Sequence, residues 1–214
     1  MAAQTRCIIF DCDGTLVDSE RLCCQALVKV FNRFGCTLSM SEALAHFEGG
    51  KLADILSSTR DRLGINVSLD RLEPLYRQEL DQLFLSHLKP MDGALNLIAY
   101  LKNKGVEFCV ASNGPKAKIE RALALTGMLE LFEGKVFSAF DTNSWKPDPD
   151  LIRYSAMNMG FTLDECLYVD DTPKGLEAGI NAGVKTVQLV GPVSRNHKLE
   201  VTKIHHLREL ETML

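Results

Sequence analysis

Residues 7–14 read Cys-Ile-Ile-Phe-Asp-Cys-Asp-Gly, an apolar run that breaks into two carboxylates and a glycine. The β-branched and aromatic residues of the run predict a buried strand, and Gly14 predicts a sharp turn directly after it. Asp11 and Asp13 would then stand at the carboxyl end of a strand, which is the edge where open α/β sheets bind ligands. Taken alone, the pair is equally compatible with an Asx turn whose carboxylates face solvent.

The composition excludes several classes of protein. The chain has 214 residues, 46% of them hydrophobic, which is enough for a substantial core. Asp and Glu number 28 against 24 Lys and Arg, and no basic block occurs, so we expect no nucleic-acid partner. No apolar stretch approaches the roughly 18 residues that span a bilayer, so we expect no membrane contact. Seven cysteines without a Cys-x-x-Cys pair fit reduced thiols in a cytoplasmic protein, and nothing marks an interface, so we expect a monomer.

The order of apolar patterns predicts the domain plan. Between Ser19 and about Leu88, apolar residues recur at helical spacing with no strand signal, whereas from Met91 onward helices alternate with short apolar runs. With residues 7–10, these runs make five predicted strands separated by helices, which is typical of an α/β fold with a parallel sheet covered on both faces. The four later runs are residues 106–111, 135–138, 166–169 and 185–190. We therefore predict one α/β domain from residues 1–16 and 88–214, with a helical domain, residues 17–87, inserted after the first strand.

Glycines at two places predict close approaches between elements. Gly175, Gly179 and Gly183 recur every four residues, which predicts a helix that lies close to the sheet and ends at Gly183. In the helical insertion, Gly49 and Gly50 would let a loop come close to the sheet domain, although a simple turn between helices explains them equally well.

Three later segments each follow a predicted strand and carry groups that suit phosphate chemistry. Ser112 and Asn113 offer a hydroxyl and backbone amides before a helix, an anion-binding arrangement that also resembles an ordinary helix cap. Lys146 lies between Trp145 and Pro147, where its charge would be held at a defined point, although most loop lysines are simply solvated.

The third segment ends in two adjacent carboxylates, Asp170 and Asp171. If they converge with Asp11 and Asp13, four negative charges share one pocket, which is strongly unfavourable without a cation. A hard divalent ion with oxygen ligands resolves the repulsion, and Mg²⁺ suits a site that also holds a substrate phosphate oxygen. The sequence therefore predicts a magnesium-dependent phosphoryl site.

These residues closely resemble the motifs of the haloacid dehalogenase-like hydrolases, in particular the phosphatases with a helical cap inserted after the first motif. The four motifs are residues 11–19, residues 112–113, Lys146, and residues 170–171, in the family's order and spacing over nearly the whole chain. The resemblance implies a Rossmann-like parallel-sheet core with an α-helical cap. It also implies a small-molecule phosphate ester as substrate.

The resemblance also implies roles for matching residues. Asp11 would be the nucleophile that forms an aspartyl-phosphate, and Asp13 would carry the proton to the leaving alcohol and from the attacking water. Mg²⁺ would be bound by Asp11, the Asp13 carbonyl and Asp171, with Asp170 as a direct or water-mediated ligand. Ser112, Asn113 and Lys146 would neutralise charge on the transferred phosphoryl group.

Substrate selectivity is expected to come from the cap. Glu20, near the first hinge, and Lys51, after the two glycines, are our candidate cap-side contacts, and Lys51 would pair with an acidic group of the substrate. Lys116, just past the phosphate loop, is a weaker candidate. Residues 47–52, 112–115 and 145–149 resemble a bacterial branch of these phosphatases that acts on 6-phosphogluconate.

Two alternatives remain open. Relatives of the β-phosphoglucomutase type carry a histidine twelve residues after the nucleophile, where this chain has Cys23, so we favour hydrolysis over a mutase reaction. Receiver-type binding modules also place carboxylates, a hydroxyl and a lysine around Mg²⁺. They lack both the helical insertion and an equivalent of Asp13, which favours an enzyme over a non-catalytic phosphorylatable module.

Overall fold

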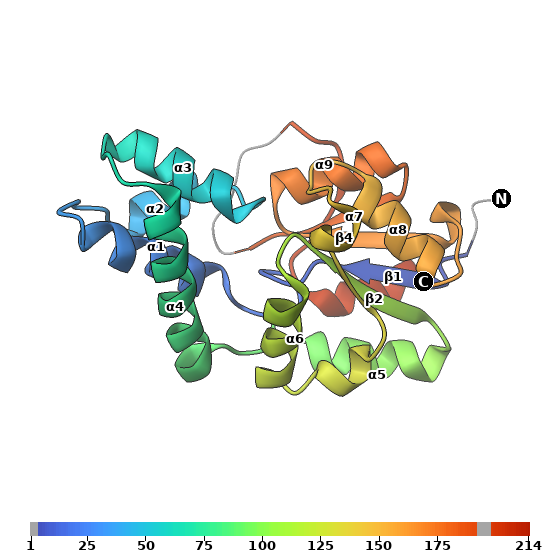
Figure 1. Cartoon of the computed structure of the whole chain (residues 1–214). Coiled ribbons are helices and arrows are strands. Elements are labelled where there is room, and N and C mark those ends of the chain that lie inside the picture. Colours follow the sequence, from blue (N-terminus) through green and yellow to red (C-terminus); the bar gives the residue numbers. More distant parts are fainter. Residues whose placement is uncertain (1–3, 192–197) are drawn as a thin grey trace.

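A six-stranded parallel sheet forms the centre of the molecule (Figure 1). The structure, a computed structural model, describes residues 4–191 and 198–214. The strands lie in the order β3-β2-β1-β4-β5-β6. Their bounds are β1 (Cys7–Phe10), β2 (Glu107–Ser112), β3 (Val136–Ser138), β4 (Cys166–Asp170), β5 (Lys185–Leu189) and β6 (Thr202–Ile204).

The five predicted strands are confirmed, and each end lies within one residue of the prediction. The sixth strand, β6, was not predicted. It has only three residues, two of them exposed, at the edge of the sheet, so it lacks the apolar run that identifies a buried strand. Its pairing with β5 depends on tertiary structure, which short-range patterns do not encode.

The chain between β1 and β2 begins with four helices, and the prediction that this stretch is helical without a strand is confirmed for residues 20–87. We refer to residues 20–87 as the helical segment. It contains α1 (Glu20–Asn32), α2 (Met40–His46), α3 (Leu52–Leu63) and α4 (Leu69–His87). The remaining helices are α5 (Ala94–Lys104), α6 (Lys116–Leu125), α7 (Ala139–Thr142), α8 (Asp150–Asn158) and α9 (Pro173–Ala182), with short 3₁₀ turns η1 (Leu129–Phe132), η2 (Leu163–Glu165) and η3 (Leu207–Met213).

Helices cover both faces of the sheet because alternate residues of each buried strand point to opposite sides. In β1, Ile8 and Phe10 belong to the apolar cluster that includes residues of α5, α6 and η3. Cys7 and Ile9 belong to a second cluster, with residues of α8 and α9. Figure 1 shows the corresponding layers, with α5 and α6 on one side of the sheet and α8 and α9 on the other.

The helical segment lies beyond the carboxyl ends of the strands (Figure 1). Its two connections to the sheet run side by side, because Val17 and Pro90 form an antiparallel bridge and Asp18 N donates to Lys89 O at 2.9 Å. Within the segment, α1 packs along α4, and buried Glu79 of α4 forms ion pairs with Lys29 of α1 and with Arg33, the residue directly after α1. The two covalent connections therefore form one narrow neck, and α4 also contacts α6 across the boundary between the helical segment and the sheet part.

The glycine stripe of α9 allows that helix to lie directly on the sheet. A methyl group on Gly179 would lie only 2.7 Å from the Tyr168 ring of β4, and one on Gly175 would collide with the Asp170 carboxylate. Gly183 ends the helix in the left-handed conformation, with φ +83°. The predicted close approach is confirmed, and it presses α9 against the strand that ends in Asp170.

Candidate active site

The topology brings Asp11 and the two later aspartates to one edge of the sheet. β1 and β4 are neighbours, with Phe10 in register with Val169, and Asp11 N donates to Val169 O at 2.9 Å. This is the point where the strand order reverses, the usual place for a ligand in an open parallel sheet. Side-chain oxygens of Asp11, Asp170 and Asp171 lie within 4.8 Å of one another, and all three residues are buried.

Lys146 supplies a buried positive charge between two of these carboxylates. Its Nζ donates to Asp11 Oδ1 at 2.7 Å and to Asp170 Oδ2 at 2.9 Å, and its side chain is 3% exposed. Burial alone lowers the pKa of the ammonium group, but the charges of Asp11 and Asp170 outweigh it and raise the pKa above its usual range. Lys146 therefore stays protonated at neutral pH.

The side chain of Asn113 holds the backbone of Lys146 in place. The Asn113 side-chain oxygen accepts from Lys146 N at 2.9 Å, and its amide nitrogen donates to Lys146 O at 3.4 Å. Ser112, the last residue of β2, is buried beside it, and its hydroxyl accepts from Gly114 N at 3.4 Å. Both predicted phosphate-binding residues thus line the site, and Asn113 also has a positioning contact that its sequence context did not indicate.

The buried carboxylates differ in how they are stabilised. Asp170 is fully buried, which raises its pKa, but Lys146, the Tyr168 hydroxyl and Thr172 N together lower it below its ordinary value. For Asp11, burial dominates over the Lys146 contact and raises the pKa to about 7. Asp11 therefore lacks the hydrogen-bond support that Asp170 has, and a further positive charge would stabilise its ionised form.

The donor set of this cluster fits a hard divalent cation. Asp11, Asp170 and Asp171 offer only carboxylate oxygens, and oxygen ligands are those preferred by Mg²⁺. Thr15 Oγ1 donates to Asp171 Oδ1 at 3.1 Å, which orients that carboxylate. Gly14, with φ +80°, makes room for it, because any side chain there would strike Asp171. The residues present are therefore compatible with the predicted magnesium site.

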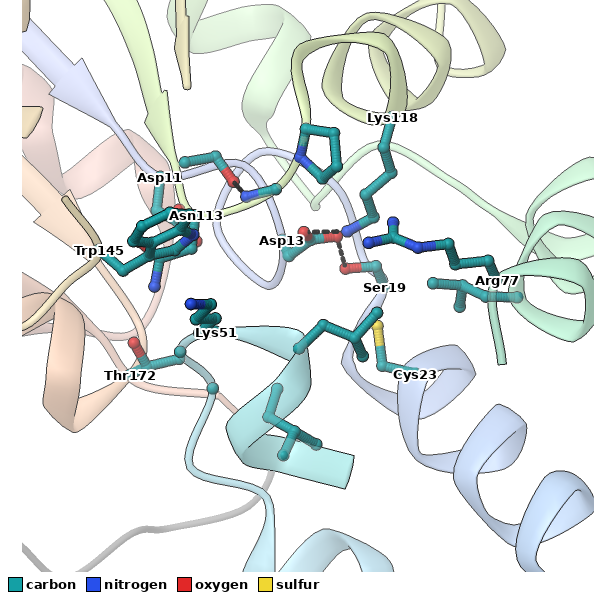
Figure 2. A pocket seen from close by; sticks show the side chains of 18 of the residues that line it. Asp11, Asp13, Ser19, Cys23, Lys51, Arg77, Asn113, Lys118, Trp145 and Thr172 are labelled. Carbon is teal, nitrogen blue, oxygen red and sulfur yellow. Dashed lines mark hydrogen bonds and ion pairs between the residues drawn. The ribbon is translucent and has the colours of Figure 1, made fainter. Parts of the chain in front are cut away.

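Asp13 faces the same cavity but has different partners (Figure 2). Its carboxylate accepts from Ser19 Oγ at 2.9 Å and forms an ion pair with Lys118. Partial burial raises its pKa, but the Lys118 charge and the two hydrogen bonds lower it below its ordinary value. The side chain of Asp13 is not part of the Asp11, Asp170 and Asp171 cluster, and the predicted metal contact of this residue is through its backbone carbonyl.

A cavity of about 520 Å³ lies between the sheet edge and the helical segment. It is lined by eight of the predicted side chains beside Asp13, namely Asp11, Glu20, Lys51, Ser112, Asn113, Lys146, Asp170 and Asp171. Lys51 Nζ lies 4.3 Å from the centre of the Trp145 ring, a cation–π contact that joins the helical segment to the loop carrying Lys146.

The loop before Lys51 comes as close to the sheet edge as its glycines suggested. A methyl group on Gly49 would lie 2.8 Å from Thr172 Cγ2, and one on Gly50 would lie 2.9 Å from Lys174 Cδ. Both glycines also have positive φ angles. The loop therefore requires glycine for its backbone shape and for its proximity to the start of α9.

Lys116 does not line the cavity, in contrast to our expectation. It is the first residue of α6 and is exposed, whereas Lys118, two residues further around the helix, points into the cavity. A two-residue step turns a helix by about 200°, so the side chains point in nearly opposite directions. The sequence contained both lysines, but the phase of the helix was needed to choose between them.

Two further residues of the cavity wall were not predicted. Tyr76 of α4 is buried beside Cys23, the residue at the mutase histidine position. Arg77 of the same helix lines the cavity on the side of Ser19 and Lys118. No local sequence pattern indicates either residue as part of the site, because their position depends on how α4 packs over the sheet edge.

Comparison with known proteins agrees with this geometry. The sequence profile of the family described as haloacid dehalogenase-like hydrolase matches residues 8–189. The chain belongs to the haloacid dehalogenase-like hydrolases. The match spans β1 to β5 and includes all four motifs.

Two curated relatives that cover most of the chain are named as phosphatases. The chain is 37% identical over 183 residues to 6-phosphogluconate phosphatase of Escherichia coli, covering 86% of this chain and 81% of that protein. It is 27% identical over 210 residues to hexitol phosphatase A of the same organism, covering 96% and 92%. The family match and these relatives identify the chain as a phosphatase.

Solved structures confirm the fold. CbbY from Rhodobacter sphaeroides, solved in complex with phosphate, superposes with a TM-score of 0.83 over 97% of this chain and 96% of that one, at 18% identity. Among the helices within residues 4–191 and 198–214, none combines the length and the apolar character needed to cross a bilayer.

Proposed function

We propose that the protein is a magnesium-dependent phosphatase that hydrolyses a small sugar phosphate or sugar-acid phosphate, such as 6-phosphogluconate, through an aspartyl-phosphate. The observation that carries this proposal is the separation of Asp11 and Asp13. Both face one cavity, but Asp11 lies against Lys146, while Asp13 lies against Ser19 and Lys118. Two carboxylates in different environments can perform different tasks in one reaction.

Asp11 is the proposed nucleophile. One of its oxygens attacks phosphorus and forms an O–P bond, while the bond from phosphorus to the ester oxygen breaks. Lys146 keeps Asp11 in place and lowers its pKa against the effect of burial. Ser112 and Asn113 lie at the end of β2 on the same sheet edge, where hydroxyl and amide donors can bind the phosphoryl oxygens.

Asp13 is the proposed proton carrier. In the structure Asp13 is paired with Lys118, which lowers its pKa, so Asp13 must take up a proton before the first step. It then gives this proton to the departing alkoxide and later takes one from the water that attacks the aspartyl-phosphate, so that inorganic phosphate leaves and Asp11 is restored. Ser19 and Lys118 hold its carboxylate beside the cavity and fix its orientation.

Mg²⁺ would be held by Asp11, Asp171 and the Asp13 carbonyl, with Asp170 as a direct or water-mediated ligand. When bound, it would neutralise charge on the phosphoryl group and on the carboxylates. The close group of three buried carboxylates supports this assignment.

We propose that the helical segment is the cap. The sequence predicted a helical domain of residues 17–87 inserted into an α/β domain of residues 1–16 and 88–214. Residues from both parts line the cavity, and the narrow neck at Val17 and Pro90 would let one part move relative to the other. Closure would exclude water while the phosphoenzyme forms. Glu20 and Lys51 are the proposed contacts with the substrate from this side.

A cytoplasmic location is also proposed. All seven cysteines are free thiols, although Cys7, Cys109 and Cys166 lie close enough on adjacent strands to hydrogen bond. Proteins that persist in oxidising compartments usually pair their cysteines.

Phosphate release from a panel of phosphorylated sugars, sugar acids and hexitols, with Mg²⁺ and with EDTA, tests the proposed function. We expect metal-dependent release with a preference for sugar-acid phosphates. Absence of release from every ester would contradict the proposal, and formation of an isomeric phosphosugar would favour the mutase reaction instead. The mutase reaction is disfavoured because the position of the mutase histidine is occupied by Cys23. This cysteine is buried against Tyr76 and does not supply the expected acid–base group.

A further inference from the structure

The far end of the cavity carries positive charges that the phosphoryl chemistry does not use. Figure 2 shows Arg77 reaching from α4 toward Ser19 and Lys118, on the side of Asp13 away from Trp145. Lys51 lies on the other side of the cavity, over the Trp145 ring. Arg77 is therefore a cation of the helical segment that lies beyond Asp13, the proposed proton carrier.

The guanidinium of Arg77 has capacity for another anion. Its Nε and Nη2 both donate to a single oxygen, Oε1 of Glu73, at 3.1 and 2.6 Å. Nη1 has no hydrogen-bond partner among residues 4–191 and 198–214. The side chain is 41% exposed, so it can reorient without leaving a buried charge unpaired. A guanidinium presents five N–H donors in a planar fork that matches a carboxylate.

Lys118 lies on the opposite wall. It extends from α6 of the sheet part, its side chain is 24% exposed, and its ammonium group contacts Asp13 while lying 5.6 Å from the centre of the Phe84 ring. An ammonium group has three donors, and Asp13 uses only part of them. A ligand anion between Arg77 and Lys118 would reduce the repulsion of two like charges and would connect the two parts of the molecule.

We propose that Arg77, with Lys118 on the facing wall, binds a carboxylate at the end of the substrate that is distal to the transferred phosphoryl group. The inference rests on the proposed phosphatase function and narrows its substrate class to acids. Arg121 of α6 also lines this end of the cavity and lies 3.5 Å from Asp81 in an exposed ion pair, so the variant below tests the contribution of Arg77 alone. A cavity of about 520 Å³ is of the size that encloses a small phosphorylated metabolite.

Two substrates test the carboxylate directly. 6-Phosphogluconate and sorbitol 6-phosphate share the same six-carbon chain and phosphate and differ only at carbon 1, which is a carboxylate in the first and a hydroxymethyl group in the second. For the wild type we expect kcat/KM to favour 6-phosphogluconate. In Arg77→Gln the ratio of the two kcat/KM values should fall by about 10- to 100-fold, the range expected for a hydrogen bond to a charged group.

Arg71→Gln is the matched control. Arg71 lies on the same helix, but its guanidinium packs 5.4 Å from the centre of the Phe34 ring and does not line the cavity. This variant should leave the ratio unchanged. The proposed carboxylate subsite is overturned if Arg77→Gln leaves the ratio unchanged, or if the wild type does not distinguish the two substrates. Either result would leave the proposed phosphatase function standing.

Failure of the proposed function gives a different result. If the wild type releases phosphate from neither compound, calorimetric binding of both compounds to Asp11→Asn, with and without Arg77→Gln, decides the matter. Equal affinities would overturn the subsite. A preference for 6-phosphogluconate that Arg77→Gln removes would support it.

Discussion

Lys146 lies directly against Asp11, with Nζ 2.7 Å from Oδ1, although the two residues are 135 positions apart in the chain. The contact is buried, so solvent and counterions screen it only weakly. It fixes the carboxylate that we propose as nucleophile and also joins β1 to β4 through Asp170.

Asp11→Asn should remove turnover, with a loss of at least about 1,000-fold, because an amide cannot form the phosphoenzyme. The substitution keeps the volume and the strand, so the melting temperature should change little. Phosphate release and thermal unfolding measure the two effects. Asp164→Asn, an exposed aspartate of η2, is the control and should keep wild-type activity. Metal-dependent release by Asp11→Asn at a rate near wild type would contradict the nucleophile assignment.

Asp171→Ala should raise the Mg²⁺ concentration needed for half-maximal activity by about 10-fold or more, because one of three clustered carboxylates is lost. A magnesium titration of phosphate release measures it. Thr15→Val, which removes the hydroxyl that orients Asp171, should shift the titration in the same direction by a smaller factor. An unchanged titration in Asp171→Ala would exclude this residue as a ligand.

Lys51→Ala should reduce activity in a substrate-dependent way. The loss should be greater for a sugar phosphate than for a small aryl phosphate, because only the larger substrate reaches the helical segment. The cation–π contact with Trp145 contributes roughly 0.5–1 kcal/mol to the contact between the helical segment and the sheet part, and its loss would affect turnover of both substrates equally. Steady-state kinetics on the two esters separate these effects, and equal losses would argue against a contact with the substrate.

Gly179→Ala should destabilise the protein by about 1–3 kcal/mol, because the added methyl group meets the Tyr168 ring and Thr186. Helix propensity alone predicts the opposite sign, a gain of about 0.5–1 kcal/mol. The sign of the change in the free energy of unfolding, measured with urea, therefore decides whether close packing dominates over helix propensity. Glu177→Ala, at an exposed position of the same helix, should change the free energy by less than about 0.5 kcal/mol.

Lys118→Met should change how stability depends on pH. In the wild type the pKa of Asp13 is lower when folded than when unfolded, so the unfolded state binds more protons as the pH falls. The stabilisation is present above the unfolded pKa of about 4 and is lost as the pH falls below it. Urea unfolding between pH 6 and pH 3, without metal, should show the wild-type curve falling more steeply than the variant's, so that the two converge. Parallel curves would contradict this, and Lys116→Met, an exposed lysine of α6, should behave like the wild type.

Those parts of the fold that rest on local pattern could be predicted from sequence. β1, β2 and β4 contain continuous apolar runs, and β5 has the β-branched pair Thr186 and Val187. Polar residues directly after β1, β2 and β4 meet because parallel strands end at one edge. β6 could not be predicted because its few residues are mostly exposed and acquire their strand conformation from β5.

The cavity wall on the side of the helical segment was harder to predict. Lys118 required the phase of α6, and Arg77 required the placement of α4 over the sheet edge. The Asn113 contact with the Lys146 backbone joins two loops, and no spacing encodes it. Sequence motifs thus indicated the groups proposed to act on phosphorus, whereas the groups proposed to select the rest of the substrate depend on long-range packing.

The paired connections at Val17 and Pro90 have a consequence for how such enzymes diversify. Because the chain leaves and re-enters the sheet at adjacent points, an insertion of different length or shape can replace residues 20–87 without altering the spacing of the strands. Acceptance of new metabolites can then evolve by exchange of one module, while the residues that break the ester bond stay where they are.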